Sequence, residues 1–502
     1  MGSKYDSGIR LSELARHLGT RHYGDDAVIR GVSADNRTIT AGDLFIAGPG
    51  ARVHAATFAQ AAWQSGAVAI CTDPAGALMI PADIPRVIVD RVPQRAGEIA
   101  AIVLGYPSAD LHSFAVTGTN GKTTTTFMID DILRALGRTT GLIGTVCVRI
   151  AGSDVPAALT TPQPVDLQKM LAQLRQHQGT DLVMEVSSHA LAQGRTRPLC
   201  FTVAGFTNLT QDHLDFHQTF EEYFAAKAKL FEPSYCQRAV VTIDDEWGER
   251  LYRQAHAVRP DAITALSMTG KAAQWQVHHR HGRPYLTGPV VDEPMEIRTD
   301  LAGDFNEANA ALALAMVLTS GVDPQLVRDI VSRRGISPVV PGRMEAVGQH
   351  PYTVVDFAHN TDALEKAMTA MRAQRPDGRL IVVSGSAGDR DKLKRPMMAQ
   401  AISQCADMFI VTDDDPHGED PAKIRSEVIA GIVPGAVWKE IPDRAQAIAA
   451  AIAYADDTDA ILIAGRGHET IQDVAGTAVE IDDRVVARQC LAQRQQARES
   501  TS

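Results

Sequence analysis

Short apolar runs alternate with amphipathic stretches along most of the chain. One run, FAVTG, leads into a segment rich in Gly and Thr, after which apolar residues recur at helical spacing from Met128 to Leu136. Further apolar runs begin at Asp181, Val203 and Ala239 and are separated by stretches with a helical pattern. This alternation is typical of a mainly parallel sheet covered by helices on both faces. The pattern therefore predicts an α/β fold for the central part of the chain.

Breaks in the pattern divide the chain into three predicted domains. The apolar helical stretch IAAIVLGY is interrupted by Pro107, and a Pro-Gly pair at Pro341 precedes a new series of strands and helices. We therefore expect a small N-terminal α/β domain over residues 1–108, a central domain over 109–341 and a C-terminal domain over 342–502. The first is too small for a whole enzyme but large enough for a binding domain.

Polar residues come directly after each apolar run of the C-terminal domain. They are Asp356, His359, Asp389, Arg390, Asp414, Asp415, His468 and Glu469. Ligands of open parallel sheets bind outside the carboxyl ends of the strands. The sequence thus predicts a ligand site along this edge of the C-terminal sheet.

The segment after FAVTG has the residue types of a phosphate-binding loop. It follows a predicted strand, opens a predicted helix and comprises Gly118, Thr119, Asn120, Gly121, Lys122, Thr123 and Thr124. Glycines let the backbone approach phosphates, the lysine supplies positive charge and a hydroxyl can hold Mg²⁺. The spacing is shorter than in the general Walker pattern, because Val116 occupies the position of the first Gly. We expect a variant nucleotide-binding loop.

Two further groups of residues could hold the metal ion of a bound nucleotide. Glu185 ends an apolar run, where a carboxylate can reach a Mg²⁺ held by Thr123. The polar cluster TQDHLDFH follows another apolar run, and its His213 could complete a second site. The alternatives are a solvated charge for Glu185, and surface salt bridges and helix caps for the cluster.

Composition excludes several classes of function. The 49 Lys and Arg against 60 Asp and Glu give a net charge of -11 without a long basic tract, which argues against sequence-tolerant binding of nucleic acid. The six cysteines are far apart and include no C-x-x-C pair, so we expect neither a zinc site nor disulfides. We expect no secretory leader, because the first residues lack its apolar stretch, and the sequence contains no run of about 18 apolar residues. We expect a cytoplasmic protein that does not insert into membranes.

Ten segments follow one another in the order and spacing of the motifs of the Mur ligases. They are TGTNGKTTTT, MEVSSHALAQGR, FTNLTQDHLDFH, YFAAKAKLF, GDFNEAN, VPGRME, DFAH, GDRDKLKRP, DDDPHGEDP and AGRGHE. From about residue 30 to 485 the chain resembles this family, and it is most similar to the UDP-N-acetylmuramoyl-tripeptide synthetases, which add the third residue of the peptidoglycan stem peptide. The resemblance implies a uridine-nucleotide domain, a central ATPase domain and a Rossmann-like domain that binds the incoming amino acid.

The resemblance also implies a reaction. The γ-phosphate of ATP passes to the terminal carboxylate of UDP-MurNAc-L-Ala-D-Glu, and the amine of a diamino acid then attacks the acyl phosphate, which gives an amide, ADP and phosphate. Positioning and charge neutralisation dominate such phosphoryl transfer. The implied partners are these three small molecules, with Mg²⁺ as the metal, and we expect a monomer.

Residue roles are carried over from the family motifs. Lys122 and the loop backbone would hold the phosphates, Thr123 and Glu185 one Mg²⁺, and His213 and Lys227 the other. Lys227 occupies the position that is carbamylated in the family, with Lys229 as a less favoured neighbour. The nucleotide would further contact Asn306, Arg343 and Asp356. The UDP-MurNAc-dipeptide would contact Asn36, which replaces the usual Ser, and Thr160, Thr161, Ser187, Gln193 and Arg195. The amino acid would contact Arg390, Asp414, Asp415, His417, Gly465 and Glu469.

The amino-acid motif departs from that of members that add diaminopimelate. Those typically have Asp-Asn-Pro-Arg where this chain has Asp414, Asp415, Pro416 and His417. His cannot form the bidentate hydrogen bonds that Arg makes with a carboxylate, and Asp415 adds a negative charge. Both changes favour a substrate that ends in an ammonium, so we predict L-lysine or L-ornithine. Meso-diaminopimelate is the alternative, because a protonated His417 can pair with a carboxylate.

Two other functions fit parts of the sequence. A glutamate-chain ligase of the folylpolyglutamate type is disfavoured by the N-terminal domain and by the DDDP and GRGHE motifs. A regulatory P-loop ATPase would turn over ATP without an amide product, and it leaves the polar C-terminal edge unexplained.

Overall fold

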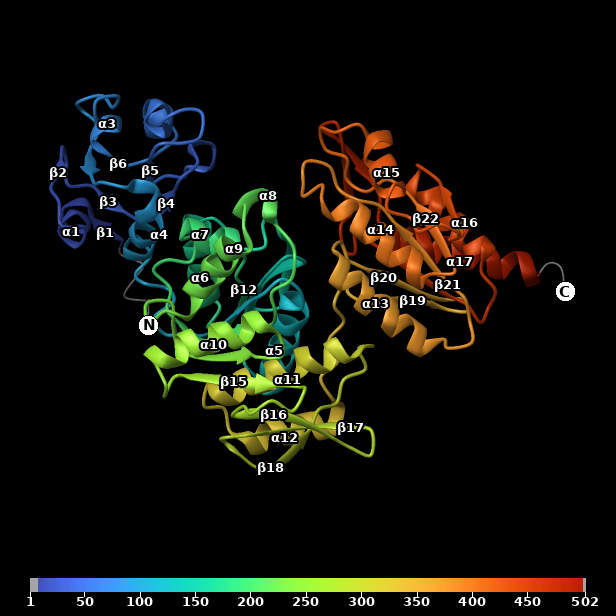
Figure 1. Cartoon of the computed structure of the whole chain (residues 1–502). Helices are drawn as coiled ribbons and strands as arrows, with labels where there is room; N and C mark the ends of the chain where they lie inside the picture. The colour runs from blue at the N-terminus through green and yellow to red at the C-terminus, as the bar shows by residue number, and fades with distance from the viewer. Residues whose placement is uncertain (1–7, 500–502) are drawn as a thin grey trace. The chain divides into compact units, whose positions relative to one another are not determined.

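The computed structural model describes residues 8–499, so the polar segment MGSKYDS at the start and the last three residues lie outside the described part (Figure 1). The chain divides into two compact units. One comprises Met1–Thr117, Leu133–Gly205 and Ala226–Ala239. The other comprises Gly118–Ile132, Phe206–Ala225 and Val240–Ser502.

The first unit begins with a five-stranded sheet in the order β2-β7-β6-β5-β4, in which β4 to β7 are parallel and β2 is antiparallel to β7. The strands are β2 (His22–Tyr23), β4 (Gly31–Ser33), β5 (Asp43–Ala47), β6 (Ala69–Thr72) and β7 (Arg86–Ile88). Side chains of a strand point alternately to its two faces. Leu44 and Ile46 accordingly share one apolar layer with helices α1 (Leu11–His17) and α4 (Val92–Val103), whereas Phe45 and Ala47 share another with α2 (Ala59–Gln64).

The rest of the first unit is built on strands in the order β11-β10-β9-β12-β8-β13-β14. They are β8 (His112–Thr117), β9 (Thr140–Ile143), β10 (Cys147–Ile150), β11 (Ser153–Pro156), β12 (Asp181–Glu185), β13 (Phe201–Phe206) and β14 (Cys236–Thr242). Strands β8, β9 and β12 are parallel, and Glu185 pairs in register with Val116. The carboxyl end of β12 therefore lies beside that of β8, from which the Gly-rich loop departs.

In the second unit, strand β15 (Ile263–Ser267) runs parallel to β16 (Trp275–Arg280), which continues into an antiparallel meander with β17 (Arg283–Gly288) and β18 (Val291–Glu296). Helix α11 (Asp304–Thr319) is apolar around its circumference and is buried without interruption from Asn309 to Leu318. A helix of this kind belongs to the interior of a domain. Helix α5 (Lys122–Ala135) follows the Gly-rich loop directly.

The C-terminal part of the second unit contains a six-stranded sheet in the order β19-β20-β24-β21-β22-β23, parallel except for the first strand. Its strands are β19 (Glu345–Gln349), β20 (Tyr352–Asp356), β21 (Leu380–Ser384), β22 (Met408–Val411), β23 (Trp438–Glu440) and β24 (Ala460–Ala464). Helices α13 (Thr361–Gln374) and α14 (Lys394–Cys405) pack on one face, and α16 (Arg444–Tyr454) and α17 (Asp483–Glu499) pack on the other (Figure 1).

The prediction of an α/β chain with parallel-rich sheets is confirmed. The loops that follow β20, β21, β22 and β24 all leave the same edge of the C-terminal sheet, because these strands are parallel. Across residues 8–499, no helix combines the length and the apolar character that crossing a membrane requires.

Candidate active site

The loop after β8 folds around its own lysine. Lys122 Nζ donates to the carbonyl oxygens of Gly118 and Thr119 at 3.0 and 2.8 Å. Gly118 and Gly121 have φ angles of 150° and 87°, which L side chains rarely adopt. A Cβ atom at Gly118 would also collide with Thr207 Oγ1. The backbone can therefore approach closely at the N-terminus of α5, where N–H groups and the helix dipole bind phosphate.

The segment after β13 supports this loop. Asn208 Oδ1 accepts from the Asn120 N–H at 3.0 Å, and Asn208 O accepts from the Thr119 N–H at 2.9 Å. Thr207 Oγ1 donates to Asn120 O at 2.7 Å. Thr119 Oγ1 lies 3.1 Å from the hydroxyl of Tyr223, on helix α9 (Phe220–Ala228). The N–H groups of Thr119 and Asn120 and the carbonyl of Asn120 are thus fixed by partners distant in sequence.

The side chain of Asn120 connects the loop to the start of α13. Asn120 Nδ2 donates to Asp362 Oδ2 at 2.8 Å. Its amide also exchanges hydrogen bonds of 3.1 and 3.3 Å with the amide of Asn360. Asn360 is the N-cap of α13, since its Oδ1 accepts from the Ala363 N–H at 2.9 Å. The same loop residue therefore contacts both the cap and the first turn of this helix.

The predicted nucleotide residues Arg343 and Asp356 also lie near the loop within the second unit. Arg343 Nη2 is 3.3 Å from Thr123 Oγ1, and the guanidinium covers the Phe357 ring at 4.2 Å. Asp356 accepts from the N–H of Met344 at 2.6 Å, and burial raises the pKa of this carboxyl.

Asn306, predicted to contact the nucleotide, is only 2% exposed. Its Nδ2 donates to Ala302 O at 2.8 Å, and its Oδ1 accepts from Asn309 Nδ2 at 3.1 Å. Asn309 Oδ1 in turn accepts from Thr125 Oγ1 at 3.3 Å, which joins α11 to α5. In this conformation, hydrogen bonds within the protein engage both ends of the Asn306 amide.

Glu185 is held rigidly at the end of β12. Its side chain is almost fully buried, at 1% exposed. Oε1 accepts from the Thr145 N–H at 2.7 Å and Oε2 from the Thr145 hydroxyl at 3.1 Å. A carboxylate with fixed orientation and a threonine hydroxyl such as that of Thr123 are hard oxygen ligands, which fit Mg²⁺.

The other two predicted metal residues differ in exposure. Lys227, near the end of α9, is 2% exposed. His213 is the N-cap of α8 (Leu214–His217) in a left-handed conformation, and its side chain is 40% exposed. An ammonium cannot bind a cation, whereas carbamylation would convert Lys227 into an oxygen ligand. The structure places Glu185 and Lys227 in the first unit and Thr123 and His213 in the second.

Four of the residues predicted to hold the muramoyl-dipeptide surround the end of β12. Thr161 Oγ1 donates to Glu185 O at 2.9 Å and accepts from the Ser187 N–H at 3.0 Å. Arg195 donates to Thr161 O at 3.1 Å and to Gln193 Oε1 at 2.7 Å. Burial lowers the pKa of Arg195, which still leaves it a cation at neutral pH.

The remaining two residues of this group, Thr160 and Asn36, both precede that cluster in the chain. Thr160 Oγ1 lies 3.1 Å from the Thr145 hydroxyl oxygen, so it joins the group around Glu185. Asn36 belongs to a different element, the 3-10 turn Asn36–Thr38 after β4, beside a 2.6 Å ion pair between Asp35 and Arg37.

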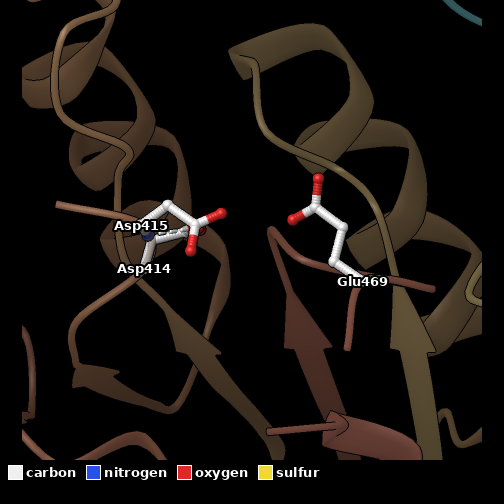
Figure 2. Close-up of side chains that lie close together, drawn as sticks. All are labelled: Asp414, Asp415 and Glu469. Atoms are coloured by element: carbon white, nitrogen blue, oxygen red, sulfur yellow. Dashed lines mark hydrogen bonds between the residues drawn. The ribbon is translucent and has the colours of Figure 1, made fainter. Parts of the chain in front are cut away.

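Three carboxyl groups meet at the carboxyl edge of the C-terminal sheet. Figure 2 shows Asp415 and Glu469 pointing toward each other from two loops, with Asp414 next to Asp415. One carboxylate oxygen from each of the three lies within 4.8 Å of the others. Burial, together with the charges of Asp414 and Asp415, raises the pKa of Glu469 to about 8. The cluster thus carries less negative charge at neutral pH than its composition suggests.

Arg466 further reduces this charge. Its Nη1 donates to Asp415 Oδ1 at 2.5 Å, and its side chain has no exposed surface. Gly465 before it has a φ of 114°, and a Cβ atom there would approach Asp414 Oδ2 closely. Arg390, predicted as an amino-acid contact, is exposed and donates to Asp389 O at 3.3 Å.

His417 lies against the hairpin of β25 (Ile471–Val474) and β26 (Thr477–Glu480). Its N–H donates to Asp473 O at 3.0 Å, and its carbonyl accepts from the Ala475 N–H at 2.8 Å. The ring Nδ1 is 3.0 Å from Asp473 Oδ2. The Asp473 N–H donates to Asp415 Oδ1, also at 3.0 Å. Asp473 therefore touches both residues at which the amino-acid motif departs from that of diaminopimelate-adding members.

Comparison with protein-family models gives three consecutive matches. Residues 28–103 match the model described as Mur ligase family, catalytic domain, residues 116–317 the Mur ligase middle domain, and residues 342–467 the Mur ligase, glutamate ligase domain. The chain belongs to the Mur ligase family. As a Mur ligase it is an ATP-dependent ligase, and the family prediction made from the motifs is confirmed.

Two relatives of this Mur ligase are similar over nearly their whole length. The UDP-N-acetylmuramoyl-L-alanyl-D-glutamate--2,6-diaminopimelate ligase of Streptomyces coelicolor is 40% identical, with 97% of each chain covered. The protein of the same name from Corynebacterium efficiens is 43% identical, with 96% of this chain and 94% of that protein covered.

Solved structures show the same fold. A structure of a UDP-N-acetylmuramoyl-L-alanyl-D-glutamate--2,6-diaminopimelate ligase is 29% identical, with a TM-score of 0.65 over 97% of this chain and 99% of that one. MurF from Acinetobacter baumannii is 18% identical, with a TM-score of 0.66 over 91% of this chain and 96% of that one. The second likeness concerns the fold alone.

Five residues of this Mur ligase that shape the candidate site were not recognised from the sequence as site residues. They are Thr145, Asn208, Tyr223, Arg466 and Asp473. Asn208, Tyr223 and Arg466 fall inside family motifs, which could have indicated them. Thr145 and Asp473 carry no local signal, because only the folded chain brings them to Glu185 and His417.

Proposed function

We propose that this Mur ligase joins 2,6-diaminopimelate to UDP-MurNAc-L-Ala-D-Glu at the expense of ATP. The observation that carries the proposal is the similarity of 40% and 43%, over nearly the whole chain, to proteins named as ligases of this amino acid. Lysine and ornithine, favoured by the sequence alone, become the alternatives.

A preference for an ammonium-ended substrate would require free negative charge at Asp415 and a weak hydrogen-bond donor at His417. The charge of Asp415 is met by the buried guanidinium of Arg466, and Glu469 holds its proton at neutral pH. The acidic composition of this edge therefore gives little preference for a second ammonium over a zwitterionic end.

The phosphoryl-transfer step is assigned to the loop and its surroundings. The N–H groups at the start of α5 and Lys122 would bind the phosphates of ATP. Thr123 and Glu185 would hold one Mg²⁺, and His213 and a carbamylated Lys227 the other. Mg²⁺, when bound, neutralises the charge that develops on the transferred phosphate. Thr145 would orient Glu185 for this role through its two hydrogen bonds.

The acceptor carboxylate is assigned to the cluster at the end of β12. Arg195 supplies a cation there, held by Gln193 and by the carbonyl of Thr161. The diamino acid is assigned to the carboxyl edge of the C-terminal sheet, and its amine would attack the acyl phosphate. Forming the C–N bond expels phosphate and leaves an amide, with the amine proton passing to solvent or to a nearby base.

The decisive experiment is product analysis by mass spectrometry. The protein is incubated with ATP, Mg²⁺ and UDP-MurNAc-L-Ala-D-Glu, in parallel with meso-diaminopimelate, LL-diaminopimelate, L-lysine and L-ornithine. We expect a tripeptide product with diaminopimelate and little with the other two. A product with lysine or ornithine alone would restore the first prediction. ATP hydrolysis without any peptide product would favour the regulatory ATPase.

A further inference from the structure

The loops that follow β21 and β22 are bonded to each other. The first loop comprises residues 385–393 and carries Arg390, and the second comprises residues 412–420 and carries Asp415. The Gly388 N–H donates to the carbonyl of Asp415 at 2.8 Å, and a Cβ atom at Gly388 would collide with a carbonyl oxygen of the second loop. The two backbones are therefore in direct contact beside the site proposed for the diamino acid.

Glu419 joins the two loops through its carboxylate. Its Oε1 accepts from the Asp389 N–H at 2.7 Å and from Arg395 Nη2 at 3.0 Å. The same Nη2 donates to the carbonyl of Ala387 at 3.1 Å. The Arg395 side chain has no exposed surface, and that of Glu419 is only 11% exposed. Because charge-assisted hydrogen bonds are short and strong, this pair fixes the first loop at two points.

The residues on either side of Arg390 are also held in place. Asp389 lies in the left-handed region with a φ of 51°, and its Oδ2 accepts from the Gly418 N–H at 3.0 Å. Asp391 is buried, and its Oδ1 accepts from the Leu393 N–H at 2.9 Å. The backbone at Arg390 is thus restrained, although its side chain is exposed.

Arg390 differs from the other cations of its segment, because it has no acidic partner. Lys392 and Arg395 both pair with Glu419. Lys394 Nζ lies 3.7 Å from a buried carboxylate. Among residues 8–499, Arg390 forms no ion pair, and its guanidinium donates to the carbonyl of the preceding residue. In a chain with a net charge of -11, an exposed guanidinium that no acidic side chain neutralises fits the recognition of a ligand carboxylate.

We propose that Glu419 and Asp389 are positioning residues for the diamino acid. They hold the two loops together, so that Arg390 and Asp415 contact the same amino acid. The guanidinium of Arg390 binds a carboxylate of that amino acid, whereas Glu419 and Asp389 contact no substrate. Fixing the loops before the substrate arrives reduces the conformational entropy that is lost on binding. The inference rests on the proposed function for the location of the amino-acid site, but it does not depend on which diamino acid is added.

The test compares two substitutions that each remove an acidic partner of Arg395. Glu427, on helix α15 (Pro421–Ile429), accepts from Arg395 Nη1 at 2.6 Å but, within the described chain, bonds to neither loop. Glu419→Gln should raise KM for the amino acid that the wild-type protein uses about tenfold or more, because a small displacement of a binding group is costly. Glu427→Gln should also destabilise the protein but leave this KM unchanged. Both variants should keep the KM values for ATP and for UDP-MurNAc-L-Ala-D-Glu.

A double-mutant cycle shows whether Glu419 acts through Arg390. Arg390→Ala should itself raise KM for the diamino acid, and Glu419→Gln should add little in that background.

A milder pair of variants keeps the test decisive if Glu419→Gln folds poorly, because Asp389 is exposed. Asp389→Asn retains an oxygen that can accept from the Gly418 N–H, so it should keep the low KM. Asp389→Ala removes this acceptor and should raise KM for the diamino acid about fivefold, as expected for the loss of one hydrogen bond. Equal KM values for the two variants would contradict the positioning role.

Three other outcomes would also contradict this role. If Glu427→Gln raises KM for the diamino acid as much as Glu419→Gln does, the effect comes from general damage around Arg395. If the effects of Glu419→Gln and Arg390→Ala add fully, Glu419 does not act through Arg390, and the positioning role is overturned while the proposed function stands. If the wild-type protein forms no tripeptide with any diamino acid, the proposed function fails and the positioning role fails with it.

Discussion

Arg466 and Asp415, 51 residues apart, form a 2.5 Å ion pair in which the arginine side chain has no exposed surface. In the sequence, Asp415 adds a second charge to an acidic motif. In the fold it neutralises a cation that would otherwise be buried alone, which is costly. The net charge of a ligand site thus depends on residues outside the motif that defines the site.

Glu469 should make stability depend on pH. Its pKa is about 8 in the folded chain against 4.5 as the ordinary value, so the folded state keeps a proton that the unfolded state has lost. Stability should therefore fall as pH rises from about 4.5 to about 8, by no more than about 1.4 kcal/mol per pH unit from this group. Urea unfolding of the wild-type protein and Glu469→Gln across this range measures the difference. The variant should show a shallower fall, and parallel curves would contradict the assignment.

The buried ion pair of Arg444 and Asp483 should be essential for stability. Both side chains have no exposed surface, and Arg444 Nη2 lies 2.7 Å from Asp483 Oδ2. Asp483→Ala would leave the guanidinium uncompensated, at a cost of about 3–5 kcal/mol in the free energy of unfolding. Asp457→Ala breaks an exposed pair with Arg498 and should cost less than about 1 kcal/mol. If urea unfolding gave similar losses of free energy for Asp483→Ala and Asp457→Ala, burial of the ion pair would not determine its contribution to stability.

Thr145 should support catalysis through Glu185. Thr145→Val keeps the backbone N–H to Oε1 but removes the hydroxyl that donates to Oε2. We expect kcat to fall about 10-fold or more and the Mg²⁺ needed for half-maximal activity to rise. Thr180→Val is the matched control, because its hydroxyl donates to Asp181 at the opposite end of β12. If Thr145→Val and Thr180→Val lowered kcat equally, the loss of activity would come from a disturbed sheet and not from the metal site.

Carbamylation should be specific to Lys227. This lysine is 2% exposed, whereas Lys229 is only half-buried on the following turn. With ¹³C-labelled bicarbonate, the wild-type protein and Lys229→Ala should each give a carbamate signal in ¹³C NMR, and Lys227→Ala should give none. We expect Lys227→Ala to lose ligase activity, because the second Mg²⁺ would lack an anionic oxygen. A signal that survives in Lys227→Ala would contradict the assignment.

Features that depend on neighbours in sequence were predictable, and partners across the fold were not. The strand, loop and helix around Lys122 follow from a β-branched run, two glycines and helical spacing, all within one short segment. The family resemblance names Thr161 and Ser187 as site residues, and the fold brings both to the end of β12 beside Glu185. Thr145 lies 40 residues from Glu185, and nothing in its own segment indicates that its N–H and hydroxyl meet that carboxylate.

The prediction of lysine is not supported by the named relatives, and the reason is again tertiary. The prediction considered Asp415 and His417 as isolated side chains, whereas Arg466 and Asp473, from later segments, bond to them. Local residue types identify which chemistry a site can perform. The strength and sign of the charges in that site can be predicted only when the tertiary partners of its residues are known.

The packing around Gly118 and Gly121 has a consequence for inhibitors. Any side chain at Gly118 would strike Thr207, and any at Gly121 would strike Asn309, in addition to the unfavourable backbone angles. A compound that draws its affinity from the peptide N–H groups of this loop would contact atoms that no substitution other than proline can remove. Resistance by mutation would then have to arise elsewhere, in residues that line the site with side chains.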